Sequence, residues 1–138
     1  MITVKFKPQF GNVTKPVRKE AHNRLGQLKS YGVRVAKEKL SVSGGTAREG
    51  APGAYFYGEP LNKWVYASAP GEPPRKQTGD LQASITSKFA GYLEGIIYSN
   101  SPYANIEFGS RLVAARPYLR PTLWTLIVAA KHAFRNLV

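Results

Sequence analysis

The chain has 138 residues, with 20 Lys and Arg against 8 Asp and Glu, which gives a formal net charge of +12. Its 43% hydrophobic and 12% aromatic residues are enough for a folded core, and they exclude a wholly disordered basic tail. The absence of cysteine excludes disulfides, zinc–thiolate sites and thiol nucleophiles. The length predicts one domain spanning residues 1–138.

The amino end predicts a short strand and a long helix. Apolar and polar residues alternate over Ile2–Phe6, which is typical of a strand with one apolar face. Thr14, able to cap, and Pro16, tolerated in a first turn, then mark a helix start. Apolar residues at helical spacing predict that this helix runs from Lys15 to Leu40. Its two glycines indicate a bend or close packing by another segment.

Residues 41–80 form a long excursion with seven Gly and five Pro, so long regular elements are not expected there. Two aromatic runs, Tyr55–Tyr57 and Lys63–Tyr66, predict a hairpin through residues 58–60. We interpret Ser43–Thr46 as a flexible linker, because no Lys follows at the spacing of a phosphate-binding loop. Long loops in compact domains are usually functional or disordered, and the aromatic residues favour packing on this subunit or on a neighbour.

Regular patterns return after residue 80. Residues 81–89 begin as a helical turn and continue as a strand from Ile85. A turn at Ala90-Gly91 leads to a second strand, Tyr92–Tyr98, and the two strands predict an antiparallel hairpin. Ser101 and Pro102 then open a short helix over residues 103–108, which Gly109 ends.

The last predicted element is a helix over Pro121–Asn136, with Arg135 in its last turn. The residues expected on its apolar face are Leu123, Leu126, Ile127, Ala130 and Phe134. The fold class is therefore α+β: a long N-terminal helix and a C-terminal helix packed on a small antiparallel sheet, with a long Gly/Pro/aromatic-rich excursion.

The residues of a catalytic site are not found in the sequence. His22 and His132 lie on different helices, and neither has a carboxylate at a spacing that suits acid–base catalysis. There is no HExxH motif, nucleophile elbow or Walker loop. We therefore expect no enzyme, no metal and no cofactor. The most apolar stretch, Leu123 to Ala130, is eight residues long and interrupted by Thr125, which is too short to span a bilayer, and the amino end lacks the pattern of a secretory signal.

The positive charge is concentrated at the amino end, where residues 1–40 carry a net +8. Such an excess suits nucleic acid, an acidic protein partner or a solubilising surface, and it does not choose between them. The basic residues spread around the first helix, so we expect at most non-specific attraction to phosphates. The candidate contacts to DNA or to an acidic partner are Arg18, Lys19, Arg24, Lys29, Arg34 and Lys37.

Three blocks in the second half of the chain form a recognisable series. Residues 68–85 contain a proline-rich lead-in followed by Thr-Gly-x-Leu-x-x-Ser-Ile. Residues 103–110 read Tyr-Ala-x-x-Glu-Phe-Gly-Ser, and residues 115–121 read Ala-Arg-Pro-Tyr-Leu-Arg-Pro. In this order the blocks resemble the tail-completion, or head–tail joining, proteins of long-tailed bacteriophages, over about residues 68–124. Ser110 and Tyr118 stand where that family more often has Thr and Phe. The motif residues are Thr78, Gly79, Leu81, Ser84, Ile85, Tyr103, Glu107, Phe108, Gly109, Arg116, Pro117 and Pro121.

The resemblance implies a structural virion protein of the phage neck, made in the host cytoplasm. It implies a homo-oligomeric ring of six copies between a head-completion or stopper protein and the tail tube or tail terminator, with DNA passing transiently through the centre. We expect the aromatic excursion to contact a neighbouring subunit or ring, since aromatics are enriched at interfaces. The candidate contacts are Tyr55, Phe56, Tyr57, Trp64 and Tyr66. The alternative is a basic, non-specific nucleic-acid-binding module. A regulatory role has no motif to support it.

The motif residues also have local physical roles. Gly79 supplies the backbone angle for a sharp turn into the ordered second half. Phe108 is expected to be an apolar anchor beside the helix stop, and Glu107 to pair with Arg116. The two Arg-Pro pairs at residues 116–117 and 120–121 are expected to hold the chain extended before the last helix.

Overall fold

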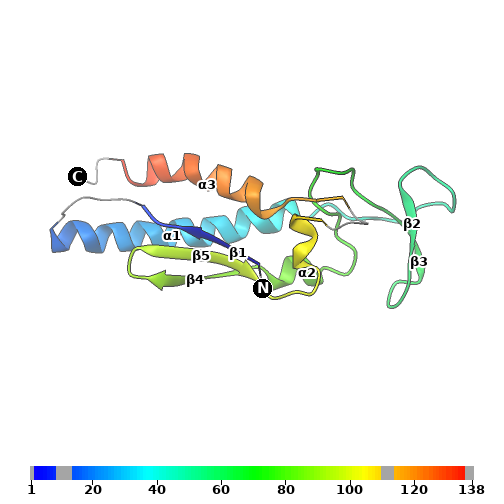
Figure 1. Cartoon of the computed structure of the whole chain (residues 1–138), viewed down its shortest axis with the longest axis horizontal. Coiled ribbons are helices and arrows are strands. Elements are labelled where there is room, and N and C mark those ends of the chain that lie inside the picture. The colour runs from blue at the N-terminus through cyan, green and yellow to red at the C-terminus, as the bar shows by residue number, and fades with distance from the viewer. Residues whose placement is uncertain (1, 9–13, 110–113, 136–138) are drawn as a thin grey trace.

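The computed structural model describes residues 2–8, 14–109 and 114–135. Its elements follow the chain as β1 (Ile2–Phe6), α1 (Lys15–Lys39), β2 (Ala54–Tyr57), β3 (Lys63–Tyr66), α2 (Asp80–Ser84), β4 (Thr86–Gly91), β5 (Glu94–Ser99), a 3-10 turn η1 (Ala104–Glu107) and α3 (Leu119–Ala133). The molecule is elongated: α1, α3 and a three-stranded sheet form a body, and the β2–β3 hairpin stands apart at one end (Figure 1). The fold is α+β, as the sequence predicts.

The body sheet has the order β1-β5-β4, and both pairs are antiparallel. Phe6 of β1 and Phe89 of β4 both pair with Gly95 in the central strand. A Cβ on Gly95 would lie 2.5 Å from the Phe6 ring, so the glycine makes room for that ring. The β4–β5 turn comes later than predicted, because β4 continues to Gly91 and Tyr92 lies in the turn.

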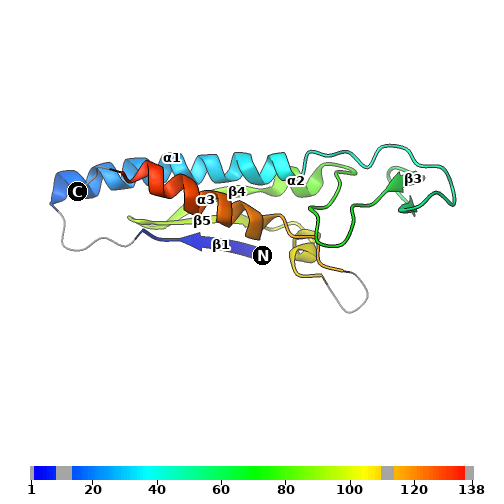
Figure 2. The same cartoon turned by 90° about the horizontal axis from the view of Figure 1, so that it is seen from above.

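Helix α1 packs against both β5 and α3. Seen from above, α3 lies alongside α1 (Figure 2). The apolar stripe of α1 is buried as predicted, with Leu25 and Ala36 fully buried. Gly32 lies in this stripe, and a Cβ there would lie 2.3 Å from Ile97 and 3.0 Å from Leu126. Close packing by β5 and α3 therefore accounts for the glycine. Thr14 holds the N-cap position, but its side chain makes no capping hydrogen bond.

The last helix begins at Leu119, two residues before the predicted start, and ends at Ala133 with Phe134 as its C-cap. The expectation that Arg120-Pro121 is extended is therefore wrong. Pro121 is the third helical residue, where an amide would have no intrahelical acceptor in any case. Arg135 follows the C-cap rather than lying in the last turn. Asn136 lies outside the described residues.

The excursion at residues 41–80 is more ordered than a linker. Segment 43–46, predicted to be flexible, is held on both sides: the Gly44 amide donates to the Lys76 carbonyl at 2.8 Å, and the Gly44 carbonyl accepts from the Tyr66 amide at 2.9 Å. The linker interpretation is wrong because this segment lies along the outer edge of β3, where the Ala47 amide also donates to Trp64. The predicted hairpin is confirmed, with Tyr55 opposite Val65 and Phe56 opposite Trp64.

The core lies between α1, α3 and the sheet, and its largest fully buried side chains include Tyr118, Leu25 and Ile97. One prediction on the last helix needs correction. Ile127, expected on the core face, is 49% exposed, whereas Leu119 and Thr122 are buried in its place. The helices in the described part of the chain are each too short or too polar to cross a membrane.

Candidate functional site

The structure gathers motif residues and hairpin residues around one cavity of about 450 Å³. The cavity lies between the hairpin and the segments that carry the sequence motifs, α2 and η1. Seven candidate residues from four separate parts of the sequence line it: Tyr55, Tyr57, Thr78, Gly79, Leu81, Tyr103 and Arg116. A volume of this size is typical of ligand pockets. We treat this cavity, with the faces of the hairpin beside it, as the candidate functional site.

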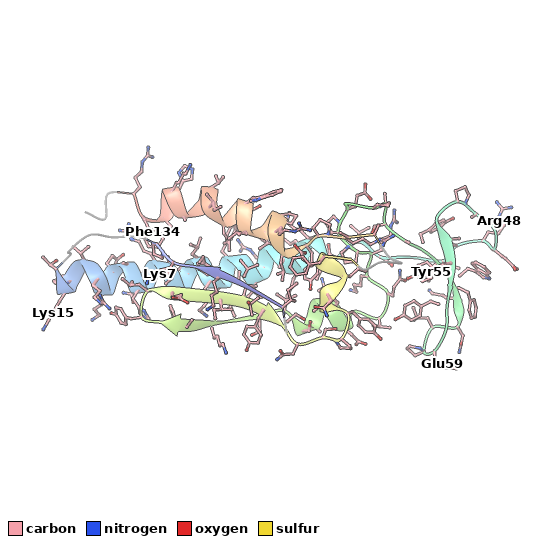
Figure 3. All side chains as sticks on the ribbon, in the orientation of Figure 1. Lys7, Lys15, Arg48, Tyr55, Glu59 and Phe134 are labelled. Atoms are coloured by element: carbon pink, nitrogen blue, oxygen red, sulfur yellow. The ribbon has the colours of Figure 1, made fainter. Side chains whose placement is uncertain are left out.

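Strand alternation divides the hairpin aromatics into two groups. Tyr55 and Tyr57 point to the same side of β2 and line the cavity, while Phe56 points to the other side. Phe56 is 54% exposed and makes an edge-to-face contact with Trp64, with ring centroids 6.0 Å apart. Figure 3 shows Tyr55 on the hairpin, at the opposite end of the molecule from Lys15. Of the predicted contact residues, Phe56 is therefore the most available to a partner.

The phenols in the cavity are partly withdrawn from water. Burial raises the pKa of Tyr55 above its usual value, and the neighbouring Tyr57 adds to the effect, while the Arg116 cation opposes it. Burial also raises the pKa of Tyr57, whose side chain hydrogen-bonds with Tyr103 and Thr78. Both phenols therefore keep their protons at neutral pH and act as hydrogen-bond donors.

Gly79 lies at the turn between the cavity and α2. Its φ of +88° is the left-handed conformation that glycine adopts without strain, as predicted for the turn before α2. Leu81 and Ser84 follow on α2, and the Ser84 hydroxyl lies 2.6 Å from the Ser99 hydroxyl of β5. Ile85 is buried in the core. This motif therefore connects the cavity wall to the body sheet.

The second motif caps the last helix. The buried Glu107 carboxylate accepts hydrogen bonds from the backbone amides of Tyr118, Leu119 (2.9 Å) and Arg120 (2.8 Å). It also pairs with the Arg120 guanidinium, Nε to Oε1, at 3.1 Å. Free amides and the positive end of the helix dipole both favour a carboxylate at this position. Glu107 thus caps the start of α3.

The predicted pair between Glu107 and Arg116 is wrong, because Arg120 occupies that position. Arg116 follows η1 and turns toward the excursion, where its Nε and Nη2 lie 3.4 and 3.3 Å from the Ser68 carbonyl. The adjoining Gly71 amide donates to the Ala115 carbonyl at 3.0 Å. The segment before α3 therefore ties the excursion to the body.

Two more motif predictions change with the structure. Phe108 is 64% exposed, and the Arg120 guanidinium lies over its ring, with Cζ 5.5 Å from the ring centroid. Phe108 is therefore not a buried apolar anchor. Gly109 has a φ of +71° and follows η1, as predicted for a helix stop. Pro117 is half-buried just before α3, and Pro121 lies inside that helix.

The candidate basic contacts on α1 do not form one free cationic face. Arg24 pairs with Glu20 at 3.0 Å and donates to the carbonyls of Ala133 and Arg135. Lys29 lies 3.3 Å from the Ser87 hydroxyl. These contacts hold α1 to the end of α3 and to β4. Lys19 and Arg34 are exposed, as is Arg18, whereas Lys37 is half-buried.

Sequence reasoning missed a stacked column on the body. His22 lies between the rings of Phe89 and Tyr92, with centroid distances of 4.3 and 4.1 Å. Arg18 and Lys29 close the two ends of the column, 5.1 Å from the Tyr92 ring and 5.2 Å from the Phe89 ring. On α1 the spacing of these basic residues is regular, but their aromatic partners come from β4 and from the turn that follows it, much later in the chain.

A second missed feature is the exposed apolar face of α3. Trp124, Ile127 and Val128 are 66%, 49% and 59% exposed and lie at helical spacing. The signal in the sequence was a helix that is apolar around most of its circumference, which leaves some apolar residues outside any single core face.

Comparison of the chain with models of protein families, with curated proteins and with solved structures found no match. Among the described residues no group of three or more His, Cys, Asp or Glu side chains is placed to hold a metal ion.

Proposed function

We propose that this chain is a structural protein of the phage neck, which assembles as a ring of six copies between the head-completion protein and the tail and lets DNA pass. The order of three motif blocks over about residues 68–124 is what ties the chain to this class. The ring, its partners and its location in the virion follow from that resemblance.

The observation that carries the proposal is a pair of unlike exposed apolar surfaces on one subunit. The first is the outer face of the hairpin, with Phe56 54% exposed, and the second is the α3 face with Trp124 and Val128. The hairpin stands at one end of the molecule, and α3 belongs to the body (Figure 1). A ring with cyclic symmetry needs such a pair, because each subunit presents one surface to the neighbour ahead and another to the neighbour behind.

The positive charge of the chain suits a channel through which DNA passes without recognition of its base sequence. The net charge of +12 favours phosphates in general, and exposed cations such as Lys19 and Arg34 are available for screened contacts. The intramolecular contacts of Arg24 and Lys29 argue against the alternative, a dedicated nucleic-acid-binding module, because such a module would present its cations to the ligand. Tight, sequence-dependent binding in a filter assay over a salt series would favour the alternative.

The decisive test uses assembling virions and matched variants. Phe56→Ser and Val128→Ser each remove one exposed apolar side chain from a proposed contact, and Tyr92→Ser and Val42→Ser remove exposed side chains elsewhere, outside the motif residues. We expect the first two variants to reduce the number of joined heads and tails at least tenfold, and the two controls to leave it unchanged. Joined particles at the wild-type number with both contact variants, or an image of the intact neck without this chain, would overturn the proposal.

A further inference from the structure

The cavity beside the hairpin contains a cationic group that has no carboxylate partner among the described residues. Arg116 is half-buried, and its contacts within the described chain are backbone carbonyls: Ser68 at 3.3 and 3.4 Å, and Ala114 at 3.2 Å. No ion pair to Arg116 occurs among the described residues, although Arg24 and Arg120 each have one. An arginine that is planar, always charged and only weakly bonded is a ready partner for an anion.

A second polar group at the same cavity is unsatisfied. Ser68 lines the cavity and is 6% exposed, and its hydroxyl oxygen has no hydrogen-bond partner within the described part of the chain. A buried polar atom without a partner costs free energy, so such atoms in a native protein call for an explanation. A ligand that bonds to this hydroxyl would supply the missing partner.

The rest of the lining defines the ligand chemistry. The charged residues of the lining are three cations, Arg75, Lys76 and Arg116, and a single carboxylate, Asp80. The phenols of Tyr55, Tyr57 and Tyr103 add donors and large flat apolar surfaces. Leu40, Leu81 and Ile106 complete an apolar floor. The cavity thus combines an apolar body with donors and excess positive charge at its wall.

We propose that this cavity binds a peptide segment of another protein through an apolar side chain and an adjacent carboxylate. The apolar side chain enters among the tyrosines and the leucines, and the carboxylate accepts hydrogen bonds from Arg116. The inference stands on the cavity alone and does not depend on the role in the phage neck. The carboxylate comes either from a C-terminus or from an Asp or Glu side chain, two sources with the same chemistry.

The first experiment separates charge from shape with small probes. N-Acetyl-phenylalanine carries the ring and the carboxylate, N-acetyl-phenylalaninamide carries the ring alone, and inorganic phosphate carries only charge. Each is titrated into the full ¹⁵N-labelled chain, and amide shifts are followed by NMR. We expect the acid to shift resonances of Gln77–Gly79, Tyr103 and Arg116 and to bind at least tenfold more tightly than the amide or phosphate. Equal binding of acid and amide, or shifts confined to other surfaces, would overturn the proposal.

The variants test whether Arg116 provides the selectivity. Arg116→Gln removes the charge, and Arg34→Gln removes an exposed charge on α1 as a matched control. We expect Arg116→Gln to bind acid and amide equally, and Arg34→Gln to retain the tenfold preference. Because Arg116 also holds the Ser68 carbonyl, Arg116→Lys is the second variant: it keeps the charge and is expected to retain at least half of the preference. A preference that survives in Arg116→Gln contradicts the inference.

Two peptides distinguish the sources of the carboxylate. One ends in a free Phe carboxylate, and the other has an internal Phe-Glu pair and an amidated C-terminus. Tighter binding of the first assigns the site to a C-terminus, and tighter binding of the second assigns it to a side chain. The control for the first peptide has an amidated C-terminus, and the control for the second has Gln in place of Glu. If neither peptide binds more tightly than its control, the proposal is wrong.

Discussion

The body and the hairpin use similar residues to opposite effect. In the body, aromatic and aliphatic side chains such as Tyr118, Leu25 and Ile97 are fully buried between helices and sheet. In the hairpin, Val65 is fully buried, but Phe56 is 54% and Tyr55 39% exposed. A two-stranded hairpin has only one partner strand and no covering layer, so it cannot bury both of its faces. The body thus buries these apolar side chains, whereas the hairpin leaves part of its apolar surface exposed.

The largest expected effect comes from removing the cap of α3. Glu107→Ala leaves three buried or partly buried amides without an acceptor, and we expect it to lower the free energy of unfolding by about 3 kcal/mol. Urea denaturation followed by circular dichroism measures this. Glu94→Ala, which removes an ion pair to Lys5 with N···O at 3.9 Å near the surface, is the control and should cost about 0.5 kcal/mol or less. Equal losses in both variants would show that the cap does not stabilise the body.

The packing of α1 against the sheet gives the next effect. Gly32→Val places methyl groups where Ile97 and Leu126 already lie, and we expect a loss of about 2 kcal/mol from overpacking. Gly26→Ala is the matched change in the same helix. Its Cβ would meet only the end of the Phe89 ring at 3.4 Å, so the higher helix propensity of Ala should leave stability unchanged or raise it by up to about 1 kcal/mol. Thermal unfolding of both variants checks this, and a destabilised Gly26→Ala would contradict it.

A smaller, pH-dependent effect belongs to Tyr118. Burial, with the Glu107 charge as a second cause, raises the pKa of this phenol in the folded chain. Above pH of about 10 the unfolded chain loses the phenol proton while the folded chain keeps it, so stability falls as the pH rises, by up to about 1.4 kcal/mol per pH unit.

Tyr118→Phe removes both this dependence and the bond from the Tyr118 hydroxyl to the Ala104 carbonyl, 2.9 Å long. We expect the variant to be about 1 kcal/mol less stable than the wild type at pH 7. The difference should narrow and then reverse between pH 9 and 11, measured by urea unfolding at each pH. A constant difference in stability across that range would contradict the proposed dependence of stability on the ionisation of Tyr118.

The smallest effect on stability is expected in the hairpin. Phe56→Ser removes a mostly exposed ring, and we expect the free energy of unfolding to change by less than about 0.5 kcal/mol. The same variant is one of the two that we expect to reduce the number of joined virions. A loss of stability as large as that of Glu107→Ala would mean that the hairpin is part of the core, and the contrast between the two regions would fail.

Much of the body follows from local signals. The stripe on α1 and the alternation in β1 predict which faces are buried, because residues 3.6 or 2 positions apart share a face whatever the rest of the chain does. Gly79 and the hairpin at residues 54–66 follow from turn chemistry. The start of α3 was misplaced by two residues because its cap is Glu107, a side chain from 12 positions before Leu119. The predicted partner of Arg116 was wrong because two arginines, Arg116 and Arg120, lie close in sequence to one another and only the fold decides which of them pairs with Glu107.

The sequence by itself determined the α+β class, the long basic helix and the aromatic hairpin, because periodicity, glycine and proline act over a few neighbouring residues. Only the tertiary structure decided what meets at the cavity. Tyr55, Thr78, Tyr103 and Arg116 are separated by up to 61 positions, and they converge because the excursion is tied back to the segments before α2 and α3. The tertiary structure also decided which apolar residues of α3 stay exposed. Trp124 and Leu126 are both apolar, but only Leu126 lies on the side of α3 that faces the core.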